Sequence, residues 1–150
     1  MKLNPWDIRA ALFAKHAQHV VLIHFPIALF LAGVALDIAA GLTRRKELAV
    51  AAYYNLAFAA FSALPAAATG LMAWQWELEG RRLKGILLFH LISGCASLLL
   101  MLAVWRVHVK ARRQPGQFFP ASRWPLEILA VVLVTLTGHL GGFLSGVNHP

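Results

Sequence analysis

The segment HVVLIHFPIALFLAGVALDIAAGL, residues 19–42, decides the fold of this chain. It is long and apolar enough to cross a bilayer, because a transmembrane helix needs about 20 mainly apolar residues. The segment nevertheless begins with two histidines and a proline, at His19, His24 and Pro26. Ionisable side chains at membrane depth are costly and commonly mark functional positions. The segment therefore predicts a transmembrane helix that carries chemically active groups.

Three further apolar segments follow, at about residues 48–74, 85–109 and 124–146. The chain has 150 residues, of which 59% are hydrophobic and only 13% are charged, a composition far from that of soluble domains. We therefore expect an all-α membrane protein with four transmembrane helices in an up-down bundle. The expected division is an N-terminal interfacial segment at 1–18, a four-helix transmembrane domain at 19–146 and a tail at 147–150.

The N-terminal segment has the composition of a helix that lies on the membrane surface. Apolar side chains alternate with charged ones between residues 5 and 17, and Pro5 suits a first helical position. No cleavable signal peptide is expected, because this region has no continuous apolar stretch. We expect the first transmembrane helix to act as the insertion signal.

The net charge of +8 arises from Lys and Arg residues that lie between the apolar segments. Membrane topology and anionic lipid headgroups explain this placement, and the chain has no basic stripe typical of nucleic-acid binding. The connections at 43–47 and 106–123 contain eight Lys and Arg, against six on the other side. The positive-inside rule then predicts that both termini are periplasmic. The single cysteine, Cys95, forms no intrachain disulfide.

Four alternating helices bring three histidines to one depth. His24, His90 and His139 each lie about four to seven residues from the same membrane face, which is roughly 6 to 10 Å at 1.5 Å per residue. His19 lies nearer the surface on that side, whereas His108 belongs to the opposite side. The alternation of the helices thus predicts a level of imidazoles near one end of the bundle.

This arrangement suits one b-type haem, which needs two neutral imidazoles from different helices. Cofactor sites in four-helix bundles are built in the core from facing helices. The first and third helices lie diagonally in an up-down bundle, so we expect His24 and His90 to be the ligand pair. His139 would then bond a haem propionate or replace one ligand.

Other interpretations remain open from the residues alone. His19, His24, His90 and His139 also suit a copper or zinc ion. A quinone or proton role is a further alternative. A purely structural role would have each imidazole bond a carbonyl that Pro26 or Pro65 leaves without its helical amide.

Two acidic residues within the apolar segments are expected to have structural roles. We expect Asp37 to form an ion pair with Arg44 or Arg45, and Glu127 to stabilise the first turn of its helix. The sequence shows neither a nucleophile with a base nor a carboxylate pair, so we expect no hydrolytic chemistry and no catalytic residues.

Several short motifs together resemble one bacterial membrane family, the domain of unknown function 2231 (DUF2231). They are His24-Phe-Pro26-Ile-Ala-Leu, Ala63-Leu-Pro65-Ala, Thr69-Gly70-Leu, His90 and Thr137-Gly138-His139-Leu-Gly141-Gly142, with His19 and Asp37. The resemblance covers nearly all of residues 19–146 and implies a four-helix integral membrane domain. Members of this family also occur fused or adjacent to Rieske and cytochrome c domains, which favours electron transfer.

We therefore expect a small multi-pass subunit of the bacterial inner membrane that binds haem b. It would pass electrons between a quinone or membrane dehydrogenase and a periplasmic carrier of the cytochrome c or Rieske type, and it would be an accessory subunit more than a stand-alone enzyme. The alternatives are a non-catalytic assembly subunit, as a homo-oligomer or within a larger complex, and a copper- or zinc-binding membrane protein.

Overall fold

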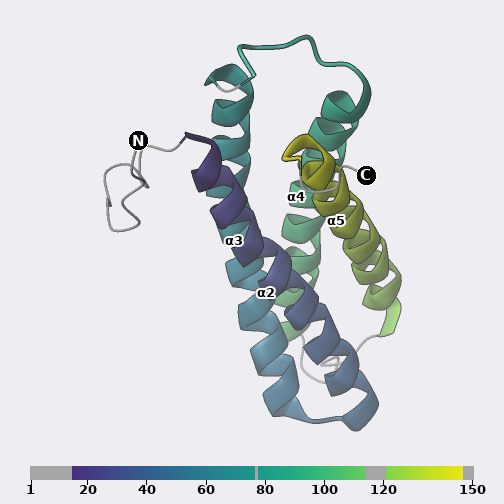
Figure 1. The fold of residues 1–150 in the computed structure, drawn as a ribbon. Helices are drawn as coiled ribbons and strands as arrows, with labels where there is room; N and C mark the ends of the chain where they lie inside the picture. The colour runs from purple at the N-terminus through teal and green to yellow at the C-terminus, as the bar shows by residue number, and fades with distance from the viewer. Residues whose placement is uncertain (1–14, 77, 114–120, 147–150) are drawn as a thin grey trace, which may run out of the picture.

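The computed structural model describes residues 15–76, 78–113 and 121–146. These residues form long helices and no strand, as expected (Figure 1). The helices are α2 (Lys15–Thr43), α3 (Lys46–Trp76), α4 (Gly85–Arg112) and α5 (Trp124–Leu144), with a short 3-10 helix η1 (Ala121–Arg123) before α5. Each of the four long helices is long and apolar enough to span a membrane. The prediction of an all-α membrane bundle is thereby confirmed.

The helices run up and down and form two hairpins. Helix α2 packs along α3, α4 packs along α5, and contacts of α3 with α4 and of α2 with α5 join the two pairs (Figure 1). The short turn from α2 to α3 is made by Arg44, whose φ of 58° reverses the chain. The end of the bundle where this turn lies, where α4 ends and where η1 and α5 begin, is called the connection end below. The opposite end, where α2 begins and α5 ends, is called the histidine end.

The hydrophobic core lies toward the connection end. Small side chains on α3 allow close helix approach, which is how helices pack when lipid removes the hydrophobic driving force. An added Cβ at Gly33 of α2 would lie only 2.8 Å from Leu56 of α3. The core residues are Phe30, Val34, Leu56, Ala59, Ala60, Ala63, Met101, Val104, Ala130 and Val134.

The histidine end has less packing between the two hairpins. The buried residues of α5 are Glu127, Ala130 and Val134, so the second half of this described helix contributes none. The hairpins are therefore held together mainly at the connection end.

The two prolines and the N-terminal interfacial segment are the remaining features that the sequence singled out in the helices. Helices α2 and α3 continue through Pro26 and Pro65, respectively. Residues 1–14 of the expected interfacial helix lie outside the described residues, and residues 15–17 belong to α2. The interfacial helix and the tail at 147–150 stay predictions.

Candidate functional site

The four histidines expected near one membrane face belong to the histidine end. His19 and His24 lie in the first turns of α2, His90 lies in the second turn of α4, and His139 lies near the end of α5. The up-down order of the helices therefore places them as the sequence predicted. Their individual surroundings differ.

His19 lies at the interface between α2 and α3. Its Nδ1 is 3.0 Å from the carbonyl oxygen of Ala66 and 3.4 Å from Oγ1 of Thr69. A Cβ at Gly70 would lie 2.9 Å from Cε1 of His19. The glycine therefore gives the imidazole room to reach across to α3.

His90 has the matching position in the other hairpin. Its Nδ1 is 3.1 Å from the carbonyl oxygen of Thr137 on α5. A Cβ at Gly141 would lie 3.1 Å from Cε1 of His90. Each hairpin thus seats one imidazole against a glycine of the neighbouring helix and bonds it to a main-chain carbonyl.

His24 and His139 are exposed on the surface of the bundle. Nδ1 of His24 is 2.6 Å from the carbonyl oxygen of Val20, one turn earlier in the same helix. The ring of His139 meets the ring of Phe143 edge to face, with 4.9 Å between the ring centroids. Of the four imidazoles, those of His19 and His90 lie within helix interfaces.

The Nδ1 contacts determine the tautomer of three rings. A carbonyl oxygen can only accept a hydrogen bond, so Nδ1 of His19, His24 and His90 carries the hydrogen. In the neutral ring the lone pair is then on Nε2, the atom that would bind a metal. The carbonyls that accept these hydrogen bonds are not the expected ones. Pro26 and Pro65 free the carbonyls of Leu22 and Phe61, whereas the three imidazoles bond to other carbonyls.

A second polar group lies at the connection end and is buried. We call Asp37, His108, Arg123 and Glu127 the charged cluster; their exposed fractions are between 0 and 5%. Asp37 comes from α2, His108 from α4, Arg123 from η1 and Glu127 from the first turn of α5. Charges at such depth persist when they are paired and hydrogen-bonded.

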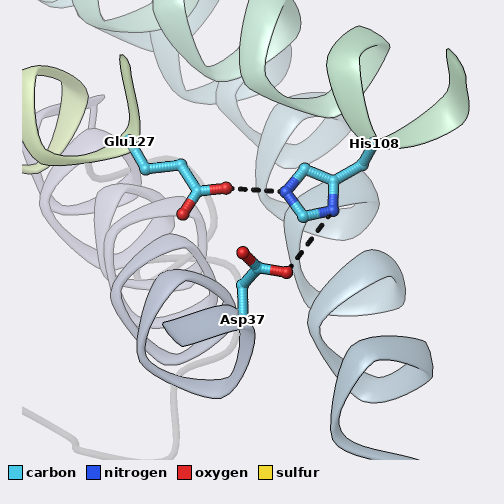
Figure 2. A group of neighbouring side chains, drawn as sticks. All are labelled: Asp37, His108 and Glu127. Carbon is cyan, nitrogen blue, oxygen red and sulfur yellow. Dashed lines mark hydrogen bonds and ion pairs between the residues drawn. The ribbon is translucent and has the colours of Figure 1, made fainter. Parts of the chain in front are cut away.

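The imidazole of His108 lies between two carboxylates (Figure 2). Its Nε2 is 2.7 Å from Oε1 of Glu127, and its Nδ1 is 3.9 Å from Oδ1 of Asp37. One ring thus connects α4 to both α5 and α2.

Arg123 completes the charged cluster by holding Asp37 with two hydrogen bonds. Its Nε donates to Oδ2 at 2.7 Å, and its Nη2 donates to Oδ1. The same Nε is 3.7 Å from Oε1 of Glu127, one helical turn further along the chain. Such two-point pairing fixes the orientation of the carboxylate as well as its charge.

The charged cluster corrects two sequence expectations. Asp37 does form an ion pair, but with Arg123, which is 86 residues away, where Arg44 or Arg45 was expected. The statement that the chain has no carboxylate pair is wrong, because the fold brings Asp37 and Glu127 to the same imidazole. Glu127 lies in the first turn of its helix as predicted, but it also binds His108.

The sequence contained a signal for this charged cluster. Asp37 follows the buried Phe30 and Val34 at helical spacing, His108 follows Met101 and Val104 in the same way, and Glu127 precedes Ala130 and Val134. Polar residues that continue a buried stripe face the same interface as the stripe. This periodicity predicts that all three point inward.

Comparison with known proteins identifies the family but no activity. The family model described as "Predicted membrane protein (DUF2231)" matches residues 15–148. No curated protein and no solved structure matches the chain. The chain therefore belongs to the DUF2231 family of predicted membrane proteins.

Proposed function

We propose that the chain binds one b-type haem at the histidine end and acts as an electron-transfer subunit of the bacterial inner membrane. The observation that carries this proposal is the shared tautomer of His19, His24 and His90. A metal-binding imidazole almost always donates its second ring hydrogen to a carbonyl, carboxylate or water. All three rings have this hydrogen bond, and the lone pair on Nε2 would suit a bond to the haem iron.

The packing of the bundle supports the same site. The two hairpins share a core at the connection end, whereas α5 buries no side chain after Val134. A planar cofactor between the hairpins would add packing where the chain alone supplies little. We propose that His24 of α2 and His90 of α4 would hold the haem iron, and that His139 would hydrogen-bond a propionate or replace one of them.

Haem would supply one-electron chemistry, and the protein would set its potential through ligation and burial. The carbonyls of Val20 and Thr137 orient the proposed ligand rings. The charge bias of the sequence favours a histidine end in the periplasmic half of the membrane. This location suits exchange with a quinone or membrane dehydrogenase in the membrane and with a cytochrome c or Rieske protein outside it.

Haem content of variants tests the ligand assignment. We expect His24→Ala and His90→Ala to lose haem from the purified protein, and we expect Cys95→Ala, an exposed change on α4, to retain it. His108→Ala removes the histidine at the connection end, so it should retain haem per folded molecule. Equal haem content in all four variants would contradict the assignment.

His19→Ala tests the choice between the two histidines of α2. His19 has the position in the α2–α3 hairpin that matches His90 in the α4–α5 hairpin. If His19→Ala loses haem while His24→Ala retains it, the ligand pair is His19 and His90. The haem site would then remain at the histidine end, with His19 in place of His24 as a ligand.

Copper or zinc is the second candidate, because the same Nε2 lone pairs suit these ions. Metal analysis of purified protein that shows no haem spectrum would distinguish a copper or zinc site from the haem site. Protein that contains neither haem nor metal at the histidine end would favour a structural or assembly subunit.

A further inference from the structure

The charged cluster has no role in the proposed haem site, which lies at the other end of the bundle. We infer that Asp37, His108 and Glu127 form a binding site for a divalent first-row transition-metal ion, with Zn²⁺ as the probe. This inference is independent of the haem proposal.

The donor set is the first argument. Asp37, His108 and Glu127 each offer one ligand atom, and these atoms lie within 4.8 Å of one another. Two carboxylates and one imidazole suit zinc, manganese or ferrous iron. The three residues come from α2, α4 and α5, so the packing of the helices holds the site together.

An unpartnered oxygen atom is the second argument. Oε2 of Glu127 is buried without a hydrogen-bond partner among the described residues, and the residue is 1% exposed. Leaving a buried carboxylate oxygen unpaired is costly. In Figure 2 this oxygen points away from His108, to which the other oxygen of Glu127 is bonded. A cation bound between the two carboxylates would pair it.

The charge of the cluster points in the same direction. Two carboxyl groups and one guanidinium lie together in the buried site. Buried charges are paired or coordinate metals. A bound divalent ion would bring two positive charges, which the two carboxylates would share with Arg123.

Arg123 has the position of an orienting partner for a metal ligand. It bonds both oxygens of Asp37, yet each carboxylate oxygen has a further lone pair. Metal-binding carboxylates are commonly held by such outer partners. Zinc–ligand distances of about 2.0 to 2.2 Å place ligand atoms at most about 4.4 Å apart. The ligand atoms, which lie within 4.8 Å of one another, would have to rearrange to reach these distances.

The test uses full-length protein in detergent after treatment with a chelator. Zn²⁺ is titrated against a competing chromophoric chelator, and the bound ion is examined by X-ray absorption spectroscopy. We expect one high-affinity Zn²⁺ per chain, with one imidazole and otherwise oxygen ligands. Glu127→Gln should weaken binding at least about tenfold, whereas Cys95→Ala should leave it unchanged.

Three results would overturn the inference. They are the absence of saturable binding, a bound Zn²⁺ with two or more imidazole ligands, and an unchanged affinity in Glu127→Gln. The second result would assign the ion to the histidine end. The spectrum of the unmutated protein decides the ligand set even if Glu127→Gln fails to fold. If the cluster takes up no metal but releases a proton as the pH is raised, a bound proton balances the carboxylates and the metal site is ruled out.

Discussion

The connection end and the histidine end both contain polar groups at membrane depth, but they satisfy them differently. At the connection end, Arg123, Asp37 and His108 bond to other side chains across α2, α4 and α5. At the histidine end, His19 and His90 bond to main-chain carbonyls, each within one hairpin. Side-chain pairing between helices holds the hairpins together, whereas carbonyl bonding keeps a nitrogen lone pair for a ligand. We therefore interpret the connection end as the clamp of the bundle, where the inferred metal ion would also bind, and we propose the histidine end as the haem site.

Removal of the guanidinium should have the largest effect on stability. Arg123→Ala leaves Asp37 buried without its two hydrogen bonds, so we expect a loss of about 3 to 5 kcal/mol. The free energy of unfolding in mixed detergent–SDS micelles measures this loss. The matched control is Arg45→Ala, because Arg45 is exposed and should change stability by less than about 0.5 kcal/mol. Equal effects of the two changes would contradict the clamp.

Two phenylalanines of α2 compare the packing of the two ends. Phe30 is fully buried in the core, whereas Phe25 is 58% exposed at the histidine end. Phe30→Ala should cost at least about 2.4 kcal/mol, the cavity term alone at roughly 24 cal/mol per Å³ over about 100 Å³. Phe25→Ala should cost less than about 0.5 kcal/mol. The same unfolding assay checks both values, and a larger loss for Phe25→Ala would show that the histidine end is the better packed one.

Two glycines test how closely His90 is seated. Gly141→Ala places a Cβ 3.1 Å from Cε1 of His90, so the ring must shift by a few tenths of an ångström, which we expect to weaken its bond to the carbonyl of Thr137. We expect a loss of about 1 kcal/mol, the value of one hydrogen bond, and a shifted imidazole signal in NMR spectra. Gly94→Ala is the control, since its Cβ would make an ordinary contact of 3.7 Å with Thr137. An unchanged His90 signal in Gly141→Ala would contradict the seating.

The apolar segments of the sequence predicted the four spans well. The expected span at 19–42 lies within α2, and the one at 85–109 lies within α4. Hydropathy is informative here because a helix satisfies its own backbone in lipid and needs a fixed length to cross it. The alternation of four helices then placed the histidines at one end without any knowledge of helix rotation.

The pairing of side chains within the charged cluster depends on how each helix is rotated about its axis, so it was not predicted from the sequence. The ion pair of Asp37 with Arg123 joins residues 86 positions apart, and it forms only because η1 and α5 present Arg123 and Glu127 to α2. An arginine near Asp37 in sequence was the simpler partner to expect. Similarly, the carbonyls that accept bonds from His19 and His90 are set by helix packing, whereas the prolines suggested different ones.

The optical spectrum of detergent-purified protein, oxidised and then reduced with dithionite, tests the central claim about the histidine end most directly. We predict the Soret band and the sharp α band of a low-spin b-type haem, bound at one per chain. A featureless spectrum from protein expressed with ample haem would contradict the claim.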